Sequence, residues 1–245
     1  MNLPTRLSNL GAAILDVLFP ARCLLCNERT AAGADILFCP SCGGRLTIIQ
    51  PPLCPCCGRL LPDSAASHLC GACLRQRPAF SKARALFIYD KFSAPLIHDF
   101  KYRGRTTGRR TFNALLRRSS VRQELKTPDL IIPVPLHHKR LRQRGFNQAL
   151  TLARSLFPED KRIIRTNLLV RRRWTTPQAS LNGHERRKNL RNAFITAHAA
   201  RVKGKNILLI DDVFTTGSTL NECAATLRHN GAHDIEALTL ARVLE

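Results

Sequence analysis

Acidic side chains are scarce in this sequence, which leaves a strongly basic chain. The 245 residues include 39 Lys and Arg but only 17 Asp and Glu, so the formal net charge is +22. Residues 101 to 205 hold 27 basic and 5 acidic residues, a surplus that alone equals the net charge of the chain. A surplus confined to one span indicates a surface for a polyanion, whether a diphosphate, a nucleic acid or an acidic protein. General solubility of an arginine-rich chain is the alternative explanation.

No apolar run in the sequence is long enough to cross a bilayer. Residues 3 to 19 carry apolar side chains at mostly helical spacing, but polar residues interrupt them. The stretch makes a poor signal peptide, because Asp16 falls in its apolar part and Arg22 precedes Cys23 where a small residue is needed. We therefore expect an amphipathic helix within residues 1–22, no membrane span and a cytoplasmic location.

Several nucleotide-binding and nucleic-acid-binding signatures are also missing. The Walker A pattern Gly-x-x-x-x-Gly-Lys-Ser/Thr does not occur, which argues against a P-loop ATPase. No helix-turn-helix, homeodomain or RNA-recognition signature accompanies the basic residues. A ligand site has to be sought in another kind of motif.

Cysteine, in contrast, is abundant and periodic. Eight of the ten cysteines form two Cys-x2-Cys-x12-Cys-x2-Cys units, and the second repeats the first 31 residues later. This spacing lets two tight turns bring four thiolates around a tetrahedral Zn²⁺, and four protein ligands leave no open position for catalysis. We predict two structural zinc sites in a double zinc-ribbon module at residues 23–78, with disulfides as the alternative. The predicted ligands are Cys23, Cys26, Cys39 and Cys42 (the first tetrad) and Cys54, Cys57, Cys70 and Cys73 (the second tetrad).

Two further residues complicate the second tetrad. Cys56 lies inside its first Cys-x2-Cys turn and His68 lies two residues before Cys70, so either could act as an alternative ligand. The symmetry of the repeat favours the four cysteines already named. The tenth cysteine, Cys223, falls on the apolar face of a predicted helix, where packing explains it.

Residues 207 to 219 read as a buried strand that passes into a polar loop. The run 207–210 is too short for a helix and apolar on both faces, as in a parallel sheet. An amphipathic helix follows, in which Thr219 and Glu222 could form a capping box at its start. Residues 235–243 read as the next strand, so the whole segment is a βαβ unit.

The loop of this unit has the composition of a site for a phosphorylated sugar. Where such a strand ends and the helix begins, free backbone N–H groups and hydroxyls converge on an anion, so Thr215 to Thr219 would cradle a phosphate. The preceding Asp211 and Asp212 would repel that phosphate, but they can accept hydrogen bonds from sugar hydroxyls or face a Mg²⁺. An acidic turn without a ligand is the alternative.

The middle of the chain supplies two more strands. Residues 85–89 read as a strand and 92–100 as a helix. The loop after that helix places Lys101 and Arg103 beside a glycine, an arrangement that can contact a diphosphate. Residues 129–136 read as a strand that its two prolines restrict to an end or an edge of the sheet.

Two basic segments follow. We interpret His137 and His138 as exposed turn residues rather than metal ligands, and we expect the cations after them to face the carboxyl edge of the sheet. Residues 171 to 194 form the most basic segment, which could close as a lid over a bound ligand or stack against single-stranded nucleic acid. A flexible basic loop is the alternative. The candidate residues in this segment are Arg171, Arg172, Arg173, Trp174 and Gln178.

The stretch Ile-Asp-Asp-Val-Phe-Thr-Thr-Gly-Ser-Thr resembles the motif with which type I phosphoribosyltransferases bind phosphoribosyl pyrophosphate (PRPP). The resemblance implies that Asp211 and Asp212 hold the ribose hydroxyls, that Mg²⁺ accompanies PRPP, and that Lys101 and Arg103 stabilise the departing diphosphate. Purine-salvage members of this class carry a carboxylate where Thr215 stands. Threonine cannot act as a general base at neutral pH, so this departure counts against 6-oxopurine salvage. The resemblance assigns the 5′-phosphate to Thr215, Thr216, Gly217, Ser218 and Thr219.

The chain as a whole resembles the ComF competence family. The resemblance rests on the cysteine repeats, Lys-Tyr-Arg-Gly, Pro-Val-Pro-Leu, Arg-Gly-Phe-Asn-Gln, Thr-Pro-Gln and the PRPP motif. It implies an α/β fold, with a type I phosphoribosyltransferase-like parallel sheet and helices on both faces over residues 79–245, preceded by the double zinc ribbon. It also implies a role in natural transformation and the use of imported DNA.

Two functions are compatible with this resemblance. The protein could transfer phosphoribosyl from PRPP to an unidentified acceptor, as a glycosyltransferase. Alternatively, it could be a non-catalytic module that binds single-stranded DNA or proteins of the competence machinery with the same fold.

Overall fold

The computed structural model describes residues 20–31, 33–62, 66–102, 108–174, 190 and 192–244. Most of the helix predicted within residues 1–22 lies outside these ranges, as do Arg103 and Gln178. In the part of the chain that is described, no helix is long and apolar enough to cross a membrane.

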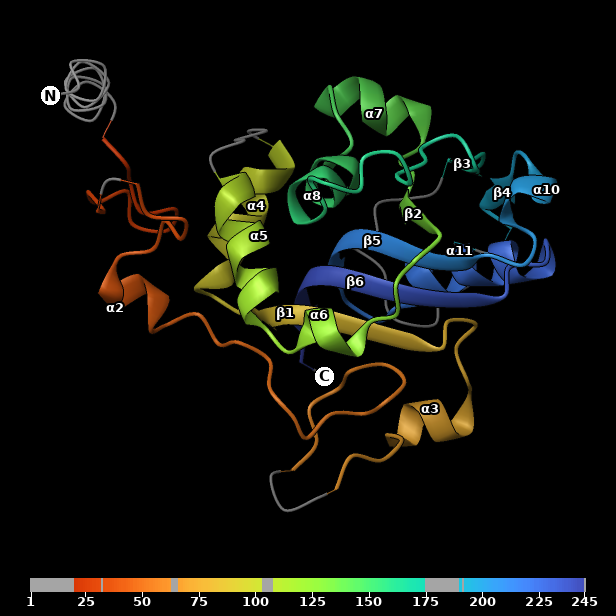
Figure 1. Ribbon diagram of the computed structural model, residues 1–245, viewed down its shortest axis with the longest axis horizontal. Helices are drawn as coiled ribbons and strands as arrows, with labels where there is room; N and C mark the ends of the chain where they lie inside the picture. Colours follow the sequence, from red (N-terminus) through yellow and green to blue (C-terminus); the bar gives the residue numbers. More distant parts are fainter. Residues whose placement is uncertain are drawn as a thin grey trace, which may run out of the picture.

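A parallel sheet of four strands, in the order β1-β6-β5-β2, lies at the centre of the molecule (Figure 1). Its central strands are buried on both faces over most of their length, and for this reason they read as continuous apolar runs. In β5, Ile207 and Leu209 pack into one core cluster, whereas Leu208 and Ile210 pack into the other. The two prolines restricted their strand to an end or an edge of the sheet, and β2 lies at an edge. The strands are β1 (Lys82–Tyr89), β2 (Leu130–Pro133), β5 (Asn206–Phe214) and β6 (Asp234–Val243).

Helices cover both faces of the sheet, as predicted (Figure 1). On one face, α4, α5 and α8 bury apolar side chains such as Phe112 and Leu152 against the strands. On the other face, α11 buries Cys223 and Leu227, and the antiparallel pair β3-β4 lies beside it. The bounds are α4 (Ser93–Tyr102), α5 (Gly108–Arg118), α6 (Val121–Glu124), α8 (Gln148–Leu156), β3 (Leu169–Arg171), β4 (Phe194–Thr196), α10 (Ala199–Val202) and α11 (Ser218–His229).

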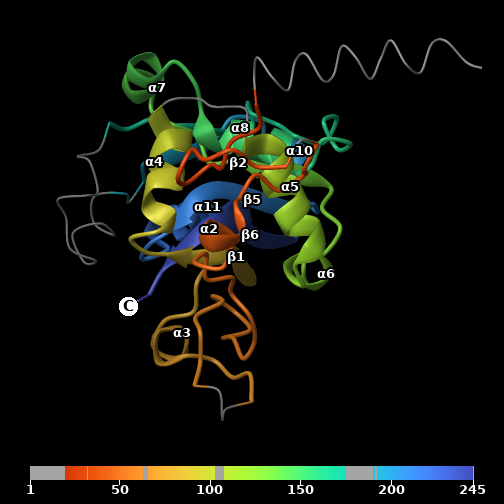
Figure 2. The ribbon, with the colours of Figure 1, turned by 90° about the vertical axis from the view of Figure 1, so that its left-hand side faces the viewer.

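The cysteine-rich segment passes around the β1 edge of the sheet (Figure 2). Its connecting stretch pairs with β1 in antiparallel fashion: Ile49 N–H donates to Leu86 O (3.0 Å) and Ile88 N–H donates to Thr47 O (2.9 Å). As a result, residues flanking the first tetrad pack on the α4–α5 face, and the second tetrad joins the core on the α11 face. Each tetrad contains one short helix, α2 (Pro40–Gly43) or α3 (Gly71–Arg75). The domain boundary after residue 78 stays a prediction.

Several element ends differ from the sequence-based expectation: β1 begins at Lys82 rather than at residue 85, and β2 ends at Pro133 rather than at residue 136. Strand β5 continues beyond Ile210 to Phe214, because its pairing with β6 continues that far, so both aspartates belong to the strand. Lys101 lies in the last turn of α4 rather than in a loop. A lysine is favourable there, because the carboxyl end of a helix carries partial negative charge.

A short helix, α7 (His138–Arg144), forms where we expected an exposed turn. It ends at Gly145, whose φ of 75° provides a left-handed cap. His137 is buried and caps the start of the helix, because its Nδ1 accepts a hydrogen bond from the N–H of Lys139 (3.3 Å). The rings of His137 and His138 lie 4.0 Å apart. The interpretation of His137 as an exposed turn residue is therefore wrong.

Candidate functional site

The turn between β5 and α11, residues 215–217 (the β5–α11 loop), depends on a glycine. Gly217 directly precedes α11 and has a φ of +73°, a conformation that side chains of L residues rarely adopt. A Cβ atom at this position would lie 2.5 Å from Cζ of Phe214, so the phenyl ring leaves no room for one. Beside it, the hydroxyls of Thr216 and Ser218 lie 2.8 Å apart in a hydrogen bond. The loop thus places hydroxyl groups at the amino end of α11.

The capping box predicted at the start of α11 is wrong. The helix begins at Ser218 with Gly217 at the N-cap position, so Thr219 lies inside its first turn. Glu222 is used elsewhere: its Oε1 accepts a hydrogen bond from the backbone N–H of Asn192 (2.6 Å), just before β4. A tertiary contact has replaced the local one.

The two aspartates lie at the carboxyl end of β5. Asp212 is buried, and its Oδ2 lies 3.5 Å from Nζ of Lys101 with no hydrogen-bond partner among the described residues. Burial, together with the charge of Asp212, raises the pKa of Asp211 to about 7. The backbone N–H of Asp212 donates to Oδ1 of Asp211 (2.9 Å). The pair therefore offers at least one buried carboxylate oxygen to a ligand that can donate a hydrogen bond or to a cation.

A cavity of about 560 Å³ opens in front of these residues. Its walls come from the ends of β2 and β5, the β5–α11 loop, α7 and the last turn of α4. The cations expected to face the carboxyl edge of the sheet lie there, since Arg140 and Arg144 of α7 line the cavity together with Lys101 and Arg171. The cavity thus combines an acidic pair with several basic side chains. A hollow of about 670 Å³ lies elsewhere, between α5 and α8, and no predicted site residue lines it.

Most of the predicted site residues meet around the 560 Å³ cavity. Thr216 lies beside the lining residues through its hydrogen bond with Ser218. Of the basic segment, Arg171 is buried and lines the cavity from β3, whereas Arg172, Arg173 and Trp174 are exposed and do not line it. Arg103 and Gln178 lie outside the described residues. The predicted residues that line the cavity are Lys101, Arg171, Asp211, Asp212, Thr215, Gly217, Ser218 and Thr219.

Gln148 is a cavity residue that the sequence reading missed. Its side chain is 5% exposed, and its Oε1 has no hydrogen-bond partner among the described residues although it lies at the cavity wall. The neighbouring Asn147 fixes the position of Gln148. The Oδ1 of Asn147 accepts a hydrogen bond from the N–H of Ala149 (2.9 Å), and its Nδ2 donates one to Val134 O (3.1 Å). An asparagine before an apolar helical pattern is an N-cap signal that could have placed Gln148 in the first turn.

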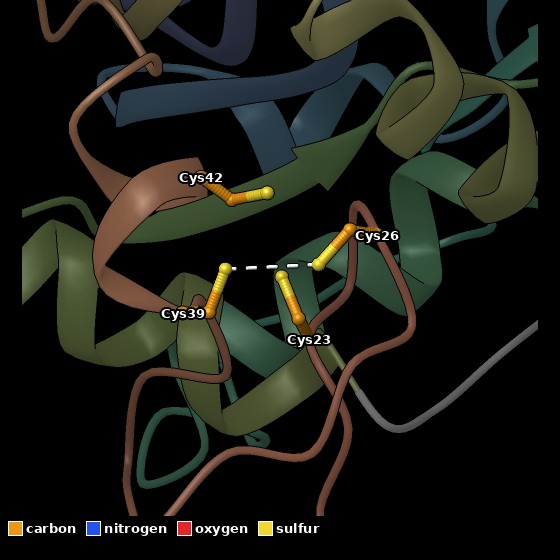
Figure 3. A group of neighbouring side chains, drawn as sticks. All are labelled: Cys23, Cys26, Cys39 and Cys42. Atoms are coloured by element: carbon orange, nitrogen blue, oxygen red, sulfur yellow. Dashed lines mark hydrogen bonds between the residues drawn. The ribbon is translucent and has the colours of Figure 1, made fainter.

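The four cysteines of each tetrad converge, and their sulfur atoms all lie within 4.8 Å of one another. Figure 3 shows the first tetrad, in which Sγ of Cys26 lies 3.6 Å from Sγ of Cys39; the Cys57–Cys70 distance in the second is also 3.6 Å. Tetrahedral Zn–S bonds of about 2.3 Å place sulfur atoms ~3.8 Å apart, whereas a disulfide would require about 2 Å. Both tetrads are therefore compatible with zinc.

The alternative ligands lie outside the second tetrad. Cys56 is buried with its Sγ 4.0 Å from Phe80 O, and His68 is exposed with its Nδ1 2.9 Å from Ala66 O. The converging group contains the four cysteines that the repeat symmetry favoured. Cys223 of α11 is fully buried in the core, which confirms its packing role.

Comparison with known proteins matches both halves of the chain. The family model "Double zinc ribbon domain" matches residues 14–74, and "Phosphoribosyl transferase domain" matches residues 152–245. Competence protein F of Haemophilus influenzae is 35% identical over 229 residues, which cover 91% of this chain and 98% of that protein. DNA utilization protein YhgH of Escherichia coli K12 is 34% identical over 92% of this chain and 98% of its own length. Competence protein ComFC of Bacillus subtilis is 30% identical over 90% and 94%, respectively.

Proposed function

The chain belongs to the ComF competence family, and from this premise we propose that its cavity binds PRPP with Mg²⁺ during the use of imported DNA in the cytoplasm. The observation that carries the proposal is the buried Oδ2 of Asp212, a residue that lines the cavity: among the described residues this oxygen has an ion-pair contact with Nζ of Lys101 at 3.5 Å but no hydrogen-bond partner. A buried carboxylate oxygen without a donor is costly unless a ligand supplies one. Sugar hydroxyls and Mg²⁺ both meet this requirement.

The charge distribution of the cavity supports the same ligand. PRPP carries a 5′-phosphate, two ribose hydroxyls and a diphosphate. The phosphate would bind residues 215–219 at the amino end of α11, and the hydroxyls would bind Asp211 and Asp212. Lys101, 3.5 Å from Asp212, would reach the diphosphate, together with Arg171 of β3 and Arg103, which lies outside the described residues.

Phosphoribosyl transfer follows from this placement. The bond between ribose C1 and the diphosphate oxygen breaks, the diphosphate leaves with the bonding electrons, and an acceptor forms a new bond to C1. Lys101 and Arg171 would stabilise the charge that develops on the diphosphate. Bound Mg²⁺ would add further neutralisation of that group. Thr215 offers a hydroxyl to the phosphate but no general base, so the acceptor must lose its proton by another route.

Calorimetric titration of the zinc-loaded protein with Mg²⁺ and PRPP tests the proposal. We expect saturable binding by the native protein and its loss in the double variant Asp211→Asn, Asp212→Asn, whose side chains keep nearly the same shape without the charges. No binding by the native protein would refute a PRPP-dependent function. Binding that survives in the double variant would place PRPP elsewhere.

A second candidate function is binding of single-stranded DNA or of proteins of the competence machinery. The observation that favours it is Trp174, which is 39% exposed and lies near cations: Nζ of Lys139 is 5.9 Å and Cζ of Arg140 is 5.8 Å from its ring centroid. An exposed indole beside basic side chains is a stacking platform for bases. Arg172 and Arg173, which directly precede it in the chain, are exposed as well.

Exchange of Arg172 and Arg173 for Gln tests this candidate and leaves Arg171 at the cavity wall. We expect weaker binding of a single-stranded oligonucleotide and a shallower dependence of affinity on salt, with unchanged PRPP binding. The Asp211→Asn, Asp212→Asn protein should bind the oligonucleotide as the native protein does. Oligonucleotide affinity that is unaffected by the two arginine exchanges would exclude this surface.

A further inference from the structure

A buried arginine of β6, Arg242, contacts both the second tetrad and Phe214, the residue just before the β5–α11 loop. Arg242 is 5% exposed. Its Nη1 donates a hydrogen bond to the carbonyl oxygen of Cys57 (2.5 Å), and its Nη2 lies 3.8 Å from Sγ of the same cysteine. One end of this side chain is therefore fixed by a predicted zinc ligand.

The guanidinium of Arg242 also lies on the ring of Phe214, with its Cζ 4.3 Å from the ring centroid. The two residues are register partners on β6 and β5. Phe80 meets the same ring edge-on at a centroid distance of 6.2 Å. Phe214 thus contacts both a cation and a second aromatic ring.

Phe214 in turn supports the loop. Its ring occupies the space that a side chain at Gly217 would need, as the 2.5 Å approach to an ideal Cβ atom shows. The backbone at Gly217 continues into Thr216 and Ser218, whose hydroxyls form the candidate phosphate cradle. A shift of the ring would move or loosen this turn, because packed interiors transmit displacement.

We infer that Arg242 and Phe214 form a positioning link through which the second tetrad holds the β5–α11 loop in its ligand-binding conformation. Four thiolates around Zn²⁺ carry a net charge of about −2, which favours a guanidinium beside Cys57. Loss of the metal would remove this attraction and the fixed position of the Cys57 carbonyl. The inference rests on the proposed function only for the identity of the ligand, since the contacts concern the loop itself.

Arg84 provides a matched control, because it is a buried arginine at the same tetrad that does not reach the loop. It is 6% exposed, and its Nη1 donates to the carbonyl oxygens of Pro55 (3.3 Å) and Ala83 (2.9 Å). Its Nε bonds Glu124 on α6, so its contacts lead away from α11. Arg84→Gln removes a buried cation from the second tetrad without touching Phe214.

Hydrogen exchange of the backbone amides of residues 214–220 tests the link in proteins whose content of two zinc ions has been measured. We expect Arg242→Gln to increase exchange there at least tenfold relative to the native protein, and Arg84→Gln to change it less than twofold. Unchanged exchange in Arg242→Gln, or an equal increase in both variants, would overturn the inference.

If Arg242→Gln does not fold or loses zinc, Phe214→Leu takes its place in the test. Phe214→Leu keeps Arg242 and the tetrad but removes the ring between them and Gly217. Faster exchange of residues 214–220 with both zinc ions retained supports the link, and native-like exchange overturns it.

Titration with Mg²⁺ and PRPP separates this inference from the proposed function. We expect a loss of affinity of at least tenfold in Arg242→Gln and less than threefold in Arg84→Gln. A native protein that does not bind PRPP refutes the proposed ligand, whereas the exchange experiment still decides on the link. If the native protein binds PRPP and folded Arg242→Gln binds it equally well, the link is refuted but the proposed ligand is not.

Discussion

The two tetrads have identical cysteine spacing and different surroundings. In the first, Cys26 is exposed, and neighbouring residues pack on α5: Leu37 N–H donates to Oγ1 of Thr111 (3.1 Å). In the second, all four cysteines are buried and belong to the core cluster that contains Phe214 and α11. A repeated metal-binding unit can therefore stabilise the periphery in one copy and support a ligand loop in the other. The surroundings of each tetrad, and not the shared cysteine spacing, determine how deeply the tetrad is buried.

The largest expected effect comes from removing one ligand of each tetrad. Cys57→Ser should lower the free energy of unfolding by more than about 4 kcal/mol, because it disrupts a buried site within the main core. Cys26→Ser should lower it by about 1–2 kcal/mol, because this ligand is exposed at the periphery. Chemical denaturation followed by circular dichroism, with zinc content measured in parallel, checks both. Equal losses would break the comparison between the tetrads.

Gly217→Ala probes the loop that the second tetrad supports. We expect a loss of about 3 kcal/mol in stability, the sum of the strained backbone and the overlap with Phe214. Gly145→Ala is the matched control, because Gly145 has a similar φ of +75° but nothing within 4 Å of its ideal Cβ. It should cost only about 1–2 kcal/mol. Thermal unfolding of both variants gives the difference, and equal costs would show that the ring does not constrain the loop.

The two tetrads should release their metal to a chelator at different rates. We expect the first zinc ion to leave at least tenfold faster than the second, since Cys26 is exposed and the second tetrad is buried. Hydrogen exchange of residues 214–220 should stay constant during the first phase and rise during the second. A rise that accompanies the first phase would contradict the assignment of the loop to the second tetrad.

The smallest expected effect is a pH dependence of PRPP affinity that arises at the acidic pair and not at either tetrad. Burial and the charge of Asp212 raise the pKa of Asp211 to about 7, so this carboxyl becomes protonated as the pH falls from 8 to 6. Because the charged form is the better acceptor, the affinity for PRPP should decrease about threefold over this range. Titrations at several pH values check this. In Asp211→Asn, only the pH dependence that comes from PRPP itself should remain. An unchanged pH profile in this variant would exclude Asp211 as the titrating group.

The sequence predicted the elements that local patterns define. Both tetrads followed from the cysteine spacing, and β5 and α11 followed from an apolar run and a helical period. The edge position of β2 followed from its prolines. Each of these features depends on residues close together in the chain.

Long-range contacts explain what the sequence did not predict. The tetrads reach opposite faces of the sheet because residues 47–49 pair with β1, and nothing in the repeat indicates that pairing. Helix α7 lacks an apolar period, so its seven residues resembled a basic turn. Gln148 and Arg242 acquire their places at the cavity and beside Phe214 only through tertiary packing.

A crystal structure of the zinc-loaded protein with Mg²⁺ and PRPP is the direct test of ligand binding at the β5–α11 loop. We expect the 5′-phosphate at residues 215–219, the ribose hydroxyls at Asp211 and Asp212, and the diphosphate toward Lys101. PRPP bound in the hollow between α5 and α8, or a ribose that does not contact the two aspartates, would contradict this expectation.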